Sequence, residues 1–227
     1  MSFSYGTKIV TDGLVFYVDT ANPRSYVSGS TTTNSLIGNE IGNLINGTDF
    51  STDNQGSWNL DGMNDYIQLN TSVTLSHLTY SIWYRPSLTD TSFRTLGQTG
   101  AWSTTEFACF FSSNPPGQQL SLVTKSNNTR TDTSLPKIIN PNFYNTWHNA
   151  TFVIEPSTQY VYYNGQFCDS DTRTNNGDIT MTKLHIGSWM GYGFFGGKIG
   201  PITLYGKALS ADEVLQNYNA LKGRFGL

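Results

Sequence analysis

The stretch of residues 183–222 limits what this chain can fold into more than any other part of its sequence. Its first part holds two runs in which apolar residues recur at every second position, 184–187 and 198–205, with a loop rich in glycine and aromatic residues between them. Alternation with a period of two is typical of strands, so we predict two strands joined by this loop. A short helix follows. It needs a sheet to dock on, because a helix of about three turns is marginal alone in water.

The sequence marks the start and the packing face of that helix. Ser210 and Glu213 have the spacing of a capping box, in which each side chain binds the backbone N–H of the other residue. Leu209 and Val214 are spaced for a hydrophobic staple across the helix start. Gly223 lies where a left-handed C-terminal cap is expected. The predicted apolar stripe consists of Val214, Leu215, Tyr218 and Leu221.

The first part of the chain contributes one clear strand. Residues 14–19 are nearly all apolar, so we expect a strand that is buried on both faces and shares a sheet with the run at 198–205. Residues 20–50 are rich in Ser, Thr, Gly and Asn and are expected to form a long loop that crosses from one sheet to the other, with short strands only near Leu44. A second polar loop is expected over residues 126–133.

Turn-forming residues divide the rest of the chain into short strands. Asp, Gly and Asn between Leu60 and Tyr66 indicate a hairpin over residues 58–69. Asn164 and Gly165 form the strongest short hairpin signal, because both residues tolerate a positive φ. Further strands are expected at 78–86, 93–96, 107–111, 120–124, 147–154 and 159–163, with a turn at 114–117. About a dozen short strands with a single helix predict a two-sheet antiparallel sandwich.

Composition excludes several classes of protein. Only 13% of the 227 residues are charged, the formal net charge is -3, and Lys and Arg do not cluster, so no nucleic-acid-binding surface is expected. No apolar run approaches the roughly 20 residues that span a bilayer, and the first residues lack the features of a secretory signal, so no membrane association is expected. The two cysteines, Cys109 and Cys168, are expected to be buried free thiols.

Five segments occur in a familiar order, although no single one of them is specific. They are residues 13–19, 60–67, 80–86, 147–165 and 186–213. Their order resembles that of the laminin-G-like, concanavalin A-like lectin/glucanase family. The resemblance implies an all-β fold: a two-sheet antiparallel jelly-roll sandwich, here with one short C-terminal α-helix. We expect an N-terminal arm over residues 1–8 and a single jelly-roll domain over residues 9–227.

The opening of the chain narrows this resemblance. The sequence KIVTDGL at residues 8–14, followed by Asp19 and by ANPRSY at residues 21–26, is similar to the opening of such domains in virion proteins of tailed bacteriophages. The resemblance implies a location in the virion and a role as a capsid decoration, head-fibre or tail component. The implied partners are other virion proteins and further copies of this chain in a homo-oligomer, contacted through surface loops and the arm.

Catalysis is not expected. Relatives that cleave glucans carry a Glu-x-Asp-x-Glu strand, whose alternation places the carboxylates on one face, where the nucleophile and the acid lie close together. No part of this sequence has that pattern, and no histidine has a local acid or cysteine partner. The residues considered are Glu40, Glu106, Glu155, Glu213, His77, His148 and His185.

Metal binding is not expected either. Asp61 and Asp65 flank a turn, and Asp169 and Asp171 lie two residues apart, as calcium-binding carboxylates often do. Aspartate is nevertheless common in turns because it binds its own backbone. The Asp-containing loop of many family members is also missing at residues 35–43. Calcium is therefore not supported, and no cofactor is expected.

Aromatic residues are the candidates for ligand contacts, since exposed rings can stack on sugar rings while Asn and Asp hold hydroxyl groups. They are Trp189, Tyr192, Phe194 and Phe195 in the glycine-rich loop, together with Trp102. Three interpretations of the loop stay open: Phe194 and Phe195 close one end of the core, the loop contacts a neighbouring subunit, or it binds a glycan. We predict a non-enzymatic virion structural protein that acts through assembly contacts. The alternative is a carbohydrate-binding adhesin that recognises host-surface glycans.

Overall fold

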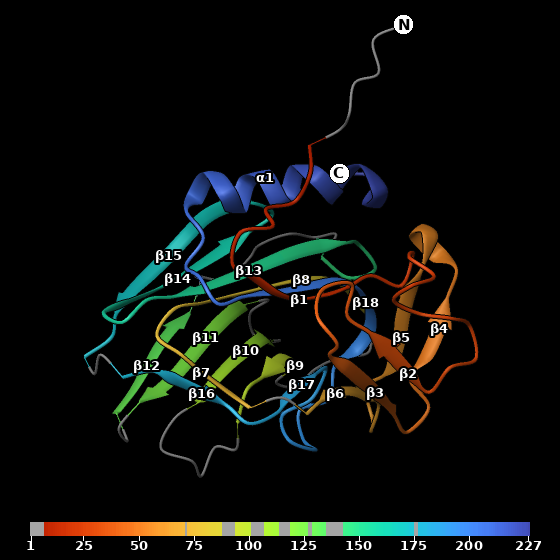
Figure 1. Ribbon diagram of the computed structural model, residues 1–227, viewed down its shortest axis with the longest axis horizontal. Helices are drawn as coiled ribbons and strands as arrows, with labels where there is room; N and C mark the ends of the chain where they lie inside the picture. The colour runs from red at the N-terminus through yellow and green to blue at the C-terminus, as the bar shows by residue number, and fades with distance from the viewer. Residues whose placement is uncertain are drawn as a thin grey trace, which may run out of the picture.

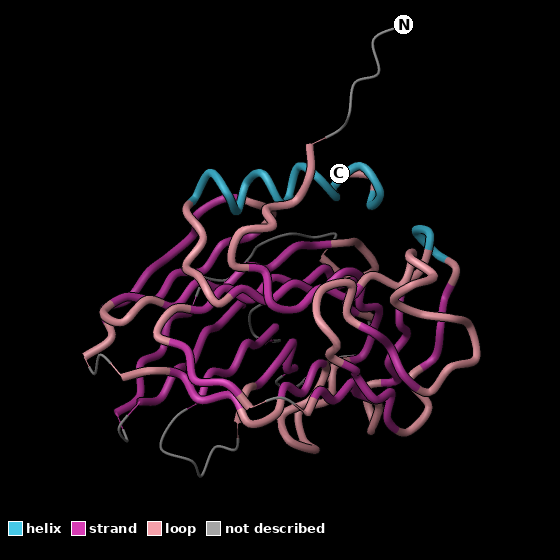
Figure 2. Tube along the Cα trace, in the orientation of Figure 1, coloured by secondary structure: helices cyan, strands magenta, loops and turns pink. Residues whose placement is uncertain are grey.

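The computed structural model describes residues 7–70, 72–87, 94–100, 107–113, 119–126, 129–134, 143–174 and 177–227. Their strands form two large sheets that lie face to face, with one helix along the outer side of one sheet (Figures 1 and 2). Every strand pair in these sheets is antiparallel. The predicted two-sheet antiparallel sandwich with one short C-terminal helix is confirmed.

Sheet A has the strand order β15-β14-β13-β8-β18-β5-β4, and β1 also pairs with β18. Its strands are β1 (Leu14–Val18), β4 (Asp49–Ser51), β5 (Ser57–Asp61), β8 (Leu78–Pro86), β13 (His148–Ile154), β14 (Thr158–Tyr163), β15 (Gln166–Thr172) and β18 (Gly196–Tyr205).

Sheet B has the strand order β12-β11-β10-β9-β17-β6-β3-β2. Its strands are β2 (Thr32–Asn34), β3 (Ile41–Ile45), β6 (Tyr66–Leu69), β9 (Arg94–Gln98), β10 (Phe107–Ser113), β11 (Gln119–Ser126), β12 (Thr129–Ser134) and β17 (Leu184–Ile186). A separate small sheet pairs β7 (Val73–Leu75) with β16 (Ile179–Met181). The helices are α1 (Ala211–Leu221) and the short 3-10 helices η1 (Asp53–Gln55) and η2 (Lys222–Phe225).

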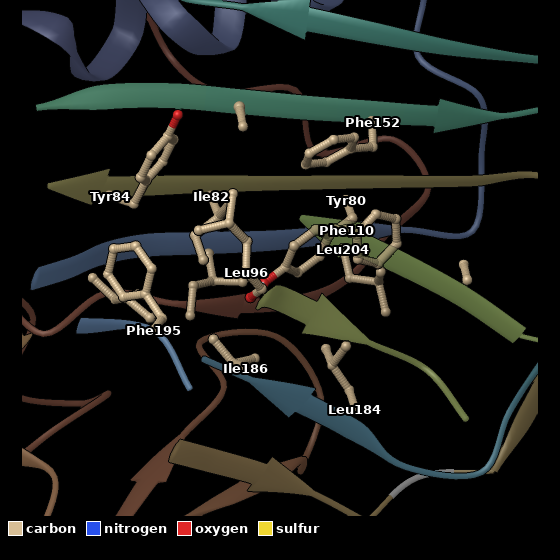
Figure 3. Close-up of a cluster of buried hydrophobic side chains, with 14 of the residues drawn as sticks. Tyr80, Ile82, Tyr84, Leu96, Phe110, Phe152, Leu184, Ile186, Phe195 and Leu204 are labelled. Atoms are coloured by element: carbon tan, nitrogen blue, oxygen red, sulfur yellow. The ribbon is translucent and has the colours of Figure 1, made fainter. Parts of the chain in front are cut away.

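The core fills the space between the two sheets. Figure 3 shows aromatic and aliphatic side chains of both inner faces meeting there. Tyr80 of sheet A stacks on Phe110 of sheet B with the ring centroids 4.5 Å apart. The Tyr80 hydroxyl donates a hydrogen bond to the Leu96 carbonyl at 2.9 Å, so the one polar atom of that ring is satisfied inside the core.

Strand β18 lies near the centre of sheet A and pairs with β1, β5 and β8. The strand predicted over residues 14–19 is β1, and the prediction that it shares the sheet of β18 is confirmed. The prediction that this opening strand is buried on both faces is wrong, since Val15 is 42% exposed. A β-bulge between Leu14 and Phe16 turns Leu14 toward the helix side and Phe16 toward the core.

The start of α1 confirms the predicted cap. The Ser210 hydroxyl accepts from the Glu213 N–H at 3.3 Å, and the Glu213 carboxylate accepts from the Ser210 N–H at 2.9 Å. Leu209 and Val214, the predicted staple, are buried in one cluster. The left-handed cap lies at Gly226, with φ 74°, and not at the predicted Gly223. Within the described residues, no helix has the length and hydrophobicity needed to span a bilayer.

The chain continues through η2 because its residues bind sheet A. Phe225 packs on Trp83 with the ring centroids 4.3 Å apart and on Trp147 at 4.5 Å. Arg224, next to it, pairs with Asp19 at 2.6 Å. These contacts explain why the chain continues past Gly223 as a 3-10 helix instead of turning away there.

Three other sequence predictions are wrong. Residues 58–69 do not form a hairpin, because β5 belongs to sheet A and β6 to sheet B, so the turn between them joins the two sheets. The region predicted as one long loop crosses between the sheets and holds a short strand near Leu44, β3, as expected, but it also contains β2 and β4, which the prediction left out. Most of the loop predicted at 126–133 is strand β12, a polar strand at the edge of sheet B.

Other local predictions hold. Asn164 and Gly165 have φ 49° and 75° and join β14 to β15, as a two-residue hairpin turn requires. Both cysteines are free thiols; Cys109 is buried, whereas Cys168 is half-buried. The turn at 114–117, Phe93 and residues 1–6 of the arm lie outside the described residues. The boundaries of the arm and of the single domain stay predictions.

His148 on β13 makes the stability of the fold depend on pH. Its Nε2 lies 2.7 Å from the Phe143 carbonyl and its Nδ1 lies 2.7 Å from the Tyr163 hydroxyl, an arrangement that a neutral ring satisfies with one donor and one acceptor. Burial lowers the pKa of His148 from 6.5 to about 4.

We therefore expect acid to destabilise the protein through this ring. Between pH 6.5 and 4 the unfolded chain binds a proton that the folded ring rejects, so the stabilisation is full above pH 6.5 and is lost toward pH 4. Urea unfolding should show that the loss of unfolding free energy from pH 7 to pH 5 is smaller by about 2 kcal/mol in His148→Gln than in the unmodified protein. His77→Gln, at an exposed site, is the control. An equal loss in both variants would contradict this account.

Candidate functional site

Residues 187–195, here called the aromatic loop, connect β17 of sheet B to β18 of sheet A. The Trp189 N–H donates to the Tyr192 carbonyl at 2.6 Å, and the Tyr192 N–H donates to the Trp189 carbonyl at 2.9 Å. Between them Met190 and Gly191 have φ 46° and 93°, which is the geometry of a two-residue turn with positive φ at both positions. The tip of the loop is therefore a closed, hydrogen-bonded turn.

The base of the aromatic loop is anchored at several points. The Phe195 N–H donates to the Gly187 carbonyl at 2.8 Å, and the Thr95 N–H donates to the Gly193 carbonyl at 3.0 Å. Arg94 donates to the Phe194 carbonyl. Gly187 has φ 83°, and a Cβ there would lie 2.3 Å from a Leu60 methyl group, so the close approach of loop and core requires glycine.

The loop divides its aromatic residues between core and surface. Phe195 is fully buried and lies 6.1 Å from Tyr84, edge to face, so it closes one end of the core. Because its side chain is buried, Phe195 is not a ligand-binding residue. Tyr192 is 73% exposed, whereas Trp189 and Phe194 are half-buried. Trp102 lies outside the described residues.

Further aromatic residues of sheet B lie beside the loop. The Tyr66 ring stacks on the His185 ring at 5.0 Å and lies 6.3 Å from Phe194. Trp189 meets Phe111 edge to face at 6.3 Å. Sequence reasoning missed Tyr66, His185 and Phe111 because they come from three strands that are far apart in the chain. Only the strand register brings them together.

A row of polar side chains crosses the outer face of sheet B next to these rings. Residues that are partners in an antiparallel register project from the same face of a sheet. The backbone pairs of β2, β3, β6, β17 and β9 align one residue from each strand, and the neighbouring Ile67 and Ile186 point inward. The row consists of Thr32, Asn43, Gln68, His185 and Gln98.

Several groups on this face have unused hydrogen-bonding capacity. His185 Nε2, Gln98 Oε1 and Thr95 Oγ1 are buried and have no hydrogen-bond partner in the described part of the chain. Burial lowers the pKa of His185 from 6.5 to about 4, so the ring is neutral near pH 7. A neutral ring can offer Nε2 as a donor or as an acceptor, depending on its tautomer. Buried groups of this kind normally find a partner.

The aspartates considered for calcium bind their own neighbourhood instead. The Asp61 carboxylate accepts from the N–H groups of Met63 and Asn64 at 2.8 and 3.1 Å, and Asp65 accepts from the Asp61 N–H at 3.1 Å. Asp169 accepts from the Ser170 N–H at 2.9 Å. Among the described residues, no three His, Cys, Asp or Glu side chains gather around a point where a metal could bind. The absence of a cofactor stays a prediction.

Unfolding measurements can distinguish the buried Phe195 from the exposed Tyr192. Phe195→Ala should lower the unfolding free energy by about 3–5 kcal/mol, because it leaves a cavity in the core. Tyr192→Ala should change it by no more than about 0.5 kcal/mol, because the ring is exposed. Denaturant unfolding of both variants tests this. A similar cost for the two substitutions would mean that the tip of the loop is part of the core.

Comparison with known proteins agrees with the fold. A family model described as the concanavalin A-like lectin/glucanases superfamily matches residues 61–215. No curated protein has a significantly similar sequence.

Solved structures with the same fold include parts of botulinum neurotoxins. The receptor-binding domain of the C/D mosaic serotype aligns with a TM-score of 0.72 and 13% identity, over 92% of this chain and 51% of that one. The serotype D ligand-binding domain in complex with N-acetylneuraminic acid aligns with a TM-score of 0.71 and 13% identity, over 91% and 50%. A third structure comes from work on botulinum neurotoxin type C, whose cell entry depends on interaction with two ganglioside molecules. It aligns with a TM-score of 0.71 and 12% identity, over 92% of this chain and 51% of that one. This chain thus spans about half the length of each of these structures, and the likeness concerns the fold.

Proposed function

The chain belongs to the concanavalin A-like lectin/glucanase superfamily, and we propose that it is a carbohydrate-binding module that recognises surface glycans. The observation that carries this proposal is the rigid aromatic loop, which holds Tyr192 in solvent and follows β17, the strand that carries His185 of the polar row. Structural neighbours crystallised as binding domains, one of them with a bound acidic sugar, support the same reading.

The two parts of the site suit the two sides of a sugar ring. An aromatic face packs well against the C–H groups of a sugar, and Tyr192 and Trp189 offer such surface at the tip of the loop. Side-chain amides bind hydroxyl groups, and Gln68, a partly exposed residue of the row, supplies one. The closed turn is already ordered before binding, so little conformational entropy is lost when a ligand arrives.

The glycan-binding interpretation was the alternative at the level of sequence, and the fold and its neighbours support it better than the assembly role. The assembly role, the virion location, the virion partners and a homo-oligomer stay predictions from the phage-like opening. The absence of catalytic activity also stays a prediction. In the described part of the chain Glu213 caps α1, and Glu155 accepts a hydrogen bond from Tyr160 at 3.3 Å. Glu106 lies outside the described residues.

A glycan array with the purified protein tests the proposal. We expect binding to a subset of glycans, and we expect Tyr192→Ala and Trp189→Ala to weaken it about threefold to tenfold, since an aromatic contact is worth about 0.5–1.5 kcal/mol. Phe167→Ala is the matched control, because Phe167 is also an exposed ring, at 57%, but lies on β15 of sheet A. An array without hits, or an equal loss with Phe167→Ala, would contradict the proposal.

A further inference from the structure

A polar pocket of about 200 Å³ opens on the outer face of sheet A. Its lining contains no apolar side chain. The residues that matter for its chemistry are Asp53, Asn59, Arg85, Asn145, Gly197 and Lys198.

The strand register explains why these side chains meet. Lys198 on β18 is the backbone partner of Asn59 on β5 and of Arg85 on β8, so the three side chains form one row on the outer face. Gly197, next in the chain, has φ 140°, and a Cβ there would lie 2.2 Å from the Arg85 carbonyl oxygen. Only glycine allows the strands to approach this closely at the floor of the pocket.

Two cations share one carboxylate in this pocket. Lys198 Nζ pairs with Asp53 and donates to the Ser51 hydroxyl at 3.0 Å. Arg85 Nη1 lies 4.0 Å from the same carboxylate, and Arg85 Nε donates to the Asn145 carbonyl at 2.8 Å. The three side chains together carry one excess positive charge in a chain whose net charge is -3.

The ion pairs are accessible enough to be exchanged. The side chains of Arg85, Lys198 and Asp53 are 30%, 21% and 51% exposed. Ion pairs at this exposure contribute little to stability, so a ligand anion can replace Asp53 at either cation at low cost. Arginine is also well suited to bind a carboxylate or sulfate through two parallel hydrogen bonds.

Neutral hydrogen-bonding groups complete the pocket. Within the residues that the structure describes, the side-chain amides of Asn59 and Asn145 have no hydrogen-bond partner. Each amide offers two donors and one acceptor oxygen, a combination that matches sugar hydroxyl groups. The pocket therefore pairs a site for one negative charge with a site for several hydroxyl groups.

We propose that this pocket is a second carbohydrate site, which binds a single sugar residue that carries a carboxylate or a sulfate group. The proposal rests on the glycan-binding function and names an acidic sugar as its ligand class. The pocket lies on the outer face of sheet A and the polar row on the outer face of sheet B, so the two sites are separate.

Nuclear magnetic resonance titration of the isotope-labelled full chain tests the proposal. Glucuronic acid should shift the side-chain amide signals of Asn59 and Asn145, and glucose should bind at least fivefold more weakly. Lys198→Gln should weaken glucuronic acid binding at least fivefold. Asp53→Asn should strengthen it about threefold, because the internal competitor for both cations is gone. Lys207→Gln, which removes a surface cation paired with Asp12 and Glu213, should leave binding unchanged.

Opposite results for Asp53 and Lys198 separate a binding site from a structural ion-pair cluster. Loss of binding in Asp53→Asn, or equal binding of glucose and glucuronic acid, would overturn the proposal. Inorganic sulfate that binds as tightly as glucuronic acid would replace the sugar site with a simple anion site. If Tyr192→Ala removes glucuronic acid binding, the acid binds at the aromatic loop, and the second site fails while the proposed function stands. If the glycan array has no hits but glucuronic acid still shifts the signals of Asn59 and Asn145, the pocket on sheet A stands and the proposed function of the aromatic loop fails.

Discussion

The docking of α1 on sheet A decides which surfaces of the sandwich are free. Leu209 and Val214 bury against Tyr205 of β18, and Asn217, at the centre of the contact, accepts from the Val10 N–H at 2.7 Å and donates to the Tyr205 hydroxyl at 2.9 Å. A buried amide needs such partners, so it fixes the helix in one position. The helix covers one side of sheet A, as Figure 1 shows, while no helix of the described residues lies on the outer face of sheet B. Both candidate sites lie outside the area under the helix.

The packing of Phe195 between the two sheets determines where the aromatic loop lies. Phe195 fills the end of the space between the sheets. Hydrogen bonds from Thr95 and Arg94 tie the loop base to β9, and the bond from Phe195 to Gly187 closes the base. The tip is thereby carried into solvent, and Tyr192 remains exposed although it is a large ring. Large exposed rings on a rigid support are typical of recognition surfaces rather than of core structure. Burial of Phe195 and exposure of Tyr192 are two results of one packing arrangement.

Local signals in the sequence predicted the elements that depend on neighbours in the chain. The capping box of Ser210 and Glu213 and the hairpin turn at Asn164 and Gly165 are of this kind, because every contact they need lies within a few residues. The turn between β5 and β6 was misread because an Asp-rich turn gives the same signal whether the next strand pairs within the sheet or enters the opposite one. Strand β12 was missed because an edge strand with two polar faces has no apolar alternation.

The candidate sites show the same limit. Trp189, Tyr192 and Phe194 were found because they are adjacent in the sequence. The polar row of sheet B and the pocket on sheet A were not, because Gln68 and His185, or Asn59 and Lys198, meet only through the register of strands that are more than a hundred residues apart in the chain. One sequence without the fold carries no information on such pairings.

A crystal structure of the protein with an oligosaccharide bound tests the central claim most directly. The account predicts a sugar ring packed against Tyr192 at the tip of the aromatic loop, with hydroxyl groups directed toward the polar row of sheet B. Density for the sugar over α1 or along the β12 edge, with the aromatic loop empty, would contradict it.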